Sequence, residues 1–150
     1  MLWPAYTENW GIFEEEIVWA KKAISADPQF SLAYINYGLA LSSIGRVDEA
    51  QVALENAVRL APKEPFAYYN LGVLKEQQGN VKAALELYKK STELDPKFEA
   101  GYFNLGAMYA NLGQFDKAIA ALKKAIELNL NAENAKAMLA EIEKVKQMKK

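Results

Sequence analysis

The sequence predicts an all-α protein, a solenoid of antiparallel helix pairs, and three observations lead to this prediction. Several residue types return every 34 residues, apolar residues between them follow helical periodicity, and Gly or Pro stands where each predicted helix should end. The recurring columns are Asn36, Asn70 and Asn104; Gly38, Gly72 and Gly106; Gly45, Gly79 and Gly113; and Ala50, Ala84 and Ala118. Independent columns that share one period indicate a repeated structural unit.

The N-terminal end departs from the repeat pattern. Residues 11–30 keep the register of the second half of a repeat, so we expect a partial repeat that contains a second helix only. Pro4 stands where a repeat has its mid-helix Gly, and because proline would break a helix there, residues 1–10 are predicted to form an irregular aromatic arm. Glu16 occupies the column that holds Ala50 in the next repeat. A tight helix crossing would not tolerate this carboxylate, so we expect no helix to cross there.

Three complete repeats follow, and each is expected to form two helices. The repeats span residues 31–64, 65–98 and 99–132, and residues 133–150 are predicted to form a C-terminal capping helix with a polar outer face.

Within the first repeat, each special residue has a predicted role. Gly45 should end the first helix, since Gly adopts the left-handed conformation without a Cβ penalty. The small Gly38 should allow a close approach of the second helix at Ala50. Pro62 should end that second helix and direct the chain into the next pair. The third repeat lacks this proline and has Leu130 in its place.

This pattern resembles the tetratricopeptide repeat. In the first complete repeat the signature places of that family hold Tyr34, Tyr37, Gly38, Leu41, Ala50, Leu54, Ala57 and Pro62. Lys75 in the second repeat and Leu130 in the third depart from the signature. The resemblance implies a right-handed superhelix, in which the first helices line a concave groove that binds a protein or peptide partner of unspecified identity.

The resemblance also implies which residues contact such a partner, namely those on the first helices that lie off the buried stripe. These are Leu32, Ile35, Asn36, Leu39, Phe66, Tyr69, Asn70, Val73, Phe103 and Asn104. The set is mostly apolar, so we expect an extended or helical, largely apolar peptide segment. Because neither Lys nor Arg occupies these places, we do not expect the carboxylate clamp of the chaperone-binding members.

The Asn column leaves two alternatives open. Asn36, Asn70 and Asn104 resemble the asparagine ladder with which some superhelical members of the family bind a peptide backbone, since an amide both donates and accepts hydrogen bonds. Alternatively, these side chains form hydrogen bonds with a neighbouring helix.

A different class of function is self-association, as an assembly scaffold or a homo-oligomer. A further alternative is that the chain is a fragment of a longer repeat protein. The N-terminal arm and the unpaired first helix would make the contact, through Trp3, Tyr6, Trp10, Ile17 and Trp19.

Composition excludes several other classes. The chain contains neither Cys nor His, so we expect no metal, no cofactor and no enzyme activity. Its one cluster of carboxylates, Glu14, Glu15 and Glu16, points in different directions around a helix and cannot converge on one substrate. A net charge of -1 does not favour nucleic acid as a partner. In the absence of a long apolar run or a signal peptide, we expect a cytoplasmic protein that does not insert into a membrane.

Overall fold

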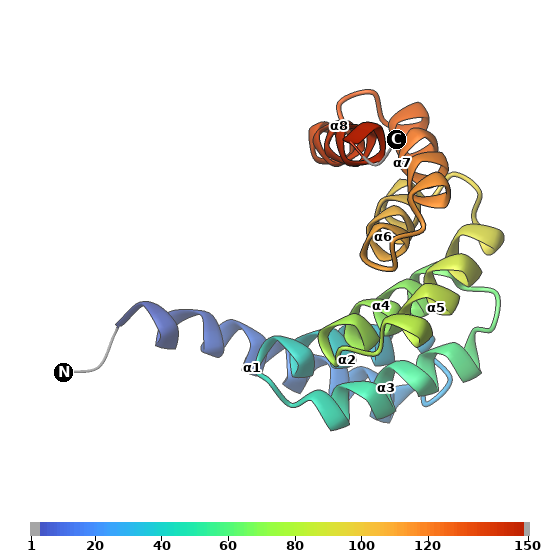
Figure 1. Ribbon diagram of the computed structural model, residues 1–150. Helices are drawn as coiled ribbons and strands as arrows, with labels where there is room; N and C mark the ends of the chain where they lie inside the picture. The colour runs from blue at the N-terminus through green and yellow to red at the C-terminus, as the bar shows by residue number, and fades with distance from the viewer. Residues whose placement is uncertain (1–3, 149–150) are drawn as a thin grey trace. The chain divides into compact units, whose positions relative to one another are not determined.

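The computed structural model describes the backbone of residues 4–148 and the side chains of residues 11–148, and every regular element in this range is a helix (Figure 1). The helices are α1 (Pro4–Ala26), α2 (Ser31–Ser43), α3 (Val47–Leu60), α4 (Pro65–Gln77), α5 (Val81–Leu94), α6 (Glu99–Asn111), α7 (Phe115–Leu128) and α8 (Glu133–Met148). The predicted all-α fold is confirmed for these residues. None of these helices is long and apolar enough to cross a membrane. The chain divides into two compact units, Met1–Leu74 and Lys75–Lys150.

In the first unit α2 packs against both of its neighbours in sequence, α1 and α3 (Figure 1). The side chains that fill this core include Ile35 and Leu41 from α2 and Leu54 from α3, and each is at most 2% exposed. Arg46, just before α3, donates two hydrogen bonds to Glu49 in the first turn of that helix. This bonding lowers the pKa of Glu49, and the carboxylate also suits the positive end of the helix dipole.

The prediction of an irregular arm over residues 1–10 is wrong for residues 4–10, which form the first turns of α1. The reason is the place of Pro4 in the helix. Proline breaks a helix in its interior, but Pro4 is the first residue of α1, where the missing N–H would have had no intrahelical partner. Gly11 therefore lies inside a helix and does not end one, and its φ is not positive.

The expectation that Ile17 is exposed is also wrong, since its side chain is only 7% exposed. Because α1 packs along α2, one side of α1 is covered, and Ile17 lies on that side. Trp19 is exposed as expected.

The glycines that follow the first helices end them as predicted. Gly45 has a φ of 78°, and the same left-handed conformation occurs at Gly79 and Gly113. After α2, the N–H of Gly45 donates to the carbonyl of Ser42, and the N–H of Arg46 donates to the carbonyl of Leu41. This pair of hydrogen bonds is the Schellman motif. Gly79 and Gly113, each with the residue that follows it, donate the same pair of hydrogen bonds.

A second signal ends helices ahead of the next repeat, and the sequence analysis missed it. The Asp95 carboxylate after α5 accepts a hydrogen bond from the N–H of Lys97, and the Asn129 amide oxygen after α7 accepts one from the N–H of Asn131. Such a turn stops α7 at Leu128 although Leu130 has replaced the usual proline.

The second unit contains helix pairs built in the same way. α6 packs against α5 and α7, and α8 packs against α7. Tyr88 of α5 is fully buried, and its hydroxyl donates to the Glu76 carboxylate at the end of α4. On α8, Ala135 and Ile142 are buried, while Lys146 forms an ion pair with Asp116 of α7.

The predicted close approach at the mid-helix glycines is confirmed. A Cβ on Gly106 would lie 2.7 Å from Cγ of Leu122, and one on Gly38 would lie 2.6 Å from Cγ of Leu54. Because real Cβ contacts are not this short, α2 and α6 can approach α3 and α7 only where the side chain is absent.

We therefore expect opposite effects from two Gly-to-Ala changes. Gly106→Ala should lower the free energy of unfolding by about 1 to 3 kcal/mol, since Leu122 must move in a packed core. Gly11→Ala should raise it by about 0.5 to 1 kcal/mol, because Gly11 is in a helix interior with open space around it. Urea denaturation of both variants measures the two effects. If both variants changed the free energy of unfolding by the same amount and in the same direction, the described packing would be contradicted.

Candidate partner-binding pocket

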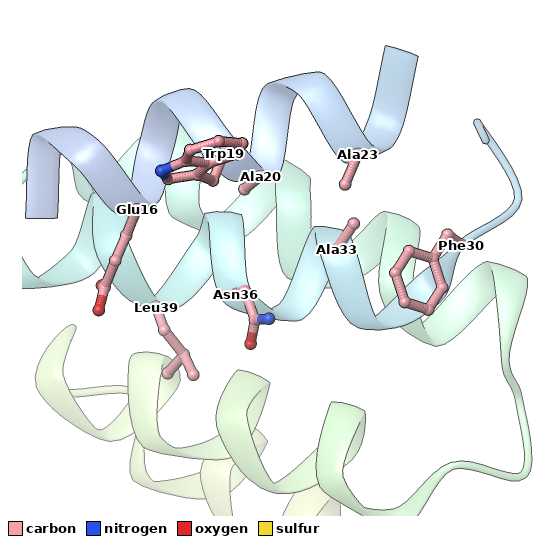
Figure 2. A pocket seen from close by; sticks show the side chains of 8 residues that line it. All are labelled: Glu16, Trp19, Ala20, Ala23, Phe30, Ala33, Asn36 and Leu39. Carbon is pink, nitrogen blue, oxygen red and sulfur yellow. The ribbon is translucent and has the colours of Figure 1, made fainter. Parts of the chain in front are cut away.

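A pocket of about 480 Å³ opens between α1 and α2 in the first unit. We call it the α1/α2 pocket, and it is lined by Glu16, Trp19, Ala20 and Ala23 of α1, by Ala33, Asn36 and Leu39 of α2, and by Phe30 just before α2. Figure 2 shows the small side chains of Ala20, Ala23 and Ala33 where the two helices meet. Because these three side chains are small, the contact leaves room for a ligand side chain.

The pocket has an apolar rim of large side chains. Trp19 is 67% exposed, Phe30 is 45% exposed and Leu39 is 38% exposed. The ammonium of Lys22 lies 4.6 Å from the centre of the Trp19 ring, which is within the range of a cation–π contact. Exposed aromatic and aliphatic side chains around a pocket are typical of protein contact sites.

The pocket contains one carboxylate, that of Glu16. In Figure 2 this side chain extends from α1 toward α2, at the end of the pocket away from Phe30. Neither a hydrogen bond nor an ion pair of Glu16 occurs within the described part of the chain. A ligand group that meets it would have to be a cation or a hydrogen-bond donor.

Only two of the predicted groove residues, Asn36 and Leu39, line the α1/α2 pocket. Leu32 and Phe66 are exposed, and Tyr69 and Val73 are half-buried. The rings of Phe66 and Tyr69 lie 6.1 Å apart, as a tilted aromatic pair. In the second unit, Phe103 lines a separate pocket of about 310 Å³ with Glu99, Asn129 and residues 131–135.

Ile35 does not lie on an accessible face, which corrects the expectation from the repeat pattern. Its side chain is 2% exposed and belongs to the core of the first unit. The reason is that α2 packs against α1 on one side and α3 on the other, so two of its faces are covered.

The three residues of the Asn column have different environments. Asn36 is exposed and lines the α1/α2 pocket. Asn70 is 6% exposed, and its amide donates a hydrogen bond of 2.7 Å to the carbonyl of Phe66, one turn earlier in the same helix. Asn104 is half-buried. Equal spacing in sequence therefore does not give these amides equal access to a ligand.

Of the residues proposed for self-association, Trp19 is exposed and lines the pocket, and Ile17 is buried. Trp3 lies outside the described residues, and Tyr6 and Trp10 lie in the part of α1 whose side chains are not described. Sequence reasoning missed the pocket residues Ala20, Ala23, Phe30 and Ala33. The available signal was Glu16, whose presence in an Ala column already indicated that no helix crosses there.

The described residues contain no group of three or more Asp, Glu, His or Cys side chains that could hold a metal ion.

Comparison with known proteins connects this architecture to one family. One profile of the tetratricopeptide repeat matches residues 65–98 and 100–131, and a second profile of the same repeat matches residues 19–52. The chain belongs to the tetratricopeptide repeat family. Tetratricopeptide repeats form protein–protein interaction modules, and the fold of this member is an all-α helical repeat solenoid. The comparison with curated proteins found no match.

Several solved tetratricopeptide repeat structures are similar to this one. A crystal structure of MamA has a TM-score of 0.82 and 26% sequence identity, over 98% of this chain and 86% of that one. TTC0263, a thermophilic repeat protein of Thermus thermophilus, has a TM-score of 0.77 and 18% identity, over 88% of this chain and 73% of that one. The first TPR of Spaghetti (RPAP3), bound to the HSP90 peptide SRMEEVD, has a TM-score of 0.75 and 20% identity, over 79% of this chain and 94% of that one.

Proposed function

We propose that this tetratricopeptide repeat protein is a non-catalytic interaction module that binds a largely apolar peptide segment of a partner protein in the α1/α2 pocket. The observation that carries the proposal is the combination of Trp19, Phe30 and Leu39, all exposed, around one pocket of about 480 Å³. Large apolar side chains that lose contact with water on binding supply most of the free energy of such interfaces.

The chemistry of the pocket also favours one class of peptide over another. The similar Spaghetti repeat is bound to the peptide SRMEEVD, which carries acidic residues. In this chain the α1/α2 pocket carries the acidic Glu16, and neither Lys nor Arg is among its lining residues. An acidic peptide would meet a like charge here, so the proposed ligand is apolar and either neutral or basic.

The test is a peptide-display selection on the complete chain, with a variant that fills the pocket as the comparison. Ala23→Arg places a long side chain inside the pocket, and Ser25→Arg places the same side chain on the same helix at an exposed position outside it. We expect apolar peptides to be enriched on the parent protein and on Ser25→Arg, and lost on Ala23→Arg. Thermal unfolding of all three proteins checks that each is folded.

Two results would contradict the proposal. The first is that no peptide is enriched on the parent protein. The second is that Ala23→Arg retains the same peptides with the same affinity, since the binding site would then lie elsewhere.

A second candidate function, self-association, is favoured by the exposed stripe of Ile12 and Trp19 on α1. These side chains are 56% and 67% exposed, and a spacing of seven residues places them on one face of the helix. Light scattering at rising concentration tests it. An average mass that rises above 16.8 kDa for the parent but not for Ile12→Ser would support self-association, and a constant monomer mass would exclude it.

A further inference from the structure

The first and third complete repeats, formed by α2 with α3 and by α6 with α7, show what normally covers the face of α1 that lines the pocket. Each has a second helix with three residues at equivalent places, which are Ala50, Leu54 and Ala57 in α3 and Ala118, Leu122 and Ala125 in α7. All six side chains are at most 1% exposed. The close contacts of Gly38 with Leu54 and of Gly106 with Leu122 identify the covering element as the first helix of the same repeat, α2 or α6.

In α1 the same three places, 34 residues before those of α3, are Glu16, Ala20 and Ala23. All three line the α1/α2 pocket, and Glu16 is exposed. Residues 4–26 form one continuous helix, so the segment just before Glu16 extends along the axis of α1 and does not fold back over the pocket. The pocket therefore lies where the first helix of a repeat would pack.

We propose that the occupant of the α1/α2 pocket is an amphipathic α-helix of a partner protein, which packs antiparallel to α1 in the position of a first repeat helix. This inference rests on the proposed function and adds the conformation and the chemistry of the ligand. The covering helices α2 and α6 each have 13 residues, which sets the length that the partner helix needs.

The first chemical requirement concerns the residue opposite Ala20. Gly106 of α6 must lack a side chain because a Cβ would lie 2.7 Å from Cγ and 2.9 Å from Cδ2 of Leu122. Ala20 stands at the place of Leu122 and has neither of these atoms. The partner helix therefore carries a large apolar residue, such as Leu, Ile or Met, where α2 and α6 have Gly.

The second requirement concerns Glu16. Its place is held by Ala50 and Ala118 in the complete repeats, where the covering helix leaves no exposed surface. A helix that covers Glu16 removes water from its carboxylate, so that group needs a new partner. The partner helix therefore carries Lys or Arg at this point, and its charge is complementary to Glu16.

The experiment uses two displayed peptide libraries, each of about 16 residues so that a helix can form. One is an alanine-rich helical scaffold with random residues on one face, and the other has the same composition with a central proline that prevents a continuous helix. Both are selected on the complete chain and on two charge-reversal variants. Glu16→Lys reverses the charge in the pocket, and Glu14→Lys is a matched control on the same helix, exposed and outside the pocket.

We expect enrichment from the helical library, with Leu, Ile or Met beside Lys or Arg on the random face. On Glu16→Lys the selected cation should change to Asp or Glu, and peptides selected on the parent should bind this variant about tenfold more weakly. Glu14→Lys should select the same peptides as the parent. Circular dichroism of an enriched peptide should report a gain of helix on binding.

The possible failures are distinguishable. Enrichment from the proline library alone, or an unchanged preference for Lys and Arg on Glu16→Lys, would overturn the helix inference and leave the proposed function standing. Enrichment from neither library would overturn both. If light scattering then reports a dimer that Ala23→Arg makes monomeric, the occupant is a second copy of this chain and not a partner protein.

Discussion

Ala118→Glu is expected to lower the free energy of unfolding by about 3 to 5 kcal/mol, which is enough to unfold a marginally stable repeat protein. Ala118 is 0% exposed, and a Cβ on the facing Gly106 would lie 3.4 Å from its carbonyl oxygen. A carboxylate at this crossing would be buried without a partner, or would force α6 and α7 apart. Urea denaturation followed by circular dichroism measures the loss.

The control for this prediction already exists within the chain, because Glu16 occupies the equivalent place in α1. Glu16→Ala should change the free energy of unfolding by no more than about 0.5 kcal/mol, since no helix covers this residue. Changes of similar size in the free energy of unfolding for Ala118→Glu and Glu16→Ala would contradict the described difference, in which α6 covers Ala118 and no helix covers Glu16.

Trp19→Ala is expected to weaken the binding of a selected peptide by about 30-fold, which corresponds to about 2 kcal/mol. Trp19 is the largest side chain on the rim of the α1/α2 pocket, and most of its surface is available to a partner. Its exposure also means that the stability of the free protein should change little. Isothermal titration calorimetry with a peptide enriched on the parent protein measures the effect.

Val18→Ala is the matched control for Trp19→Ala. Val18 is the preceding residue on the same helix and is 50% exposed, but it does not line the pocket. We expect Val18→Ala to change the affinity by less than about threefold. Equal losses for the two variants would show that the peptide does not bind in the pocket.

Much of the fold could be predicted from the sequence because its signals are local and repeated. The glycines at 45, 79 and 113 end helices through the conformation of their own backbone, which no distant contact has to supply. The close helix crossings at Gly38 and Gly106 followed from pairs of small residues that recur at a constant spacing. Because the same residue types recur at the same places, the role inferred for a residue in one repeat also applies to its equivalents in the other repeats.

One error of the sequence analysis concerns a position where the repeat is incomplete. Pro4 was compared with a mid-helix Gly, but the residue begins α1. A proline has opposite effects at the first position and in the interior of a helix, so the outcome depends on where the helix starts. Periodicity alone does not determine this start, because residues 11–30 match only the second half of a repeat.

The sequence alone established the repeat period, the helix pairs and the small-residue crossings, since these follow from backbone conformation and from regular spacing. Access to individual side chains required the folded chain. Asn36 is exposed and Asn70 is buried although both occupy the same column, and Ile35 is in the core although it was expected on an open face. The physical reason is that exposure depends on how the neighbouring helices pack. α2 packs against both α1 and α3, which buries Ile35, whereas Asn36 lines the pocket that remains open between α1 and α2.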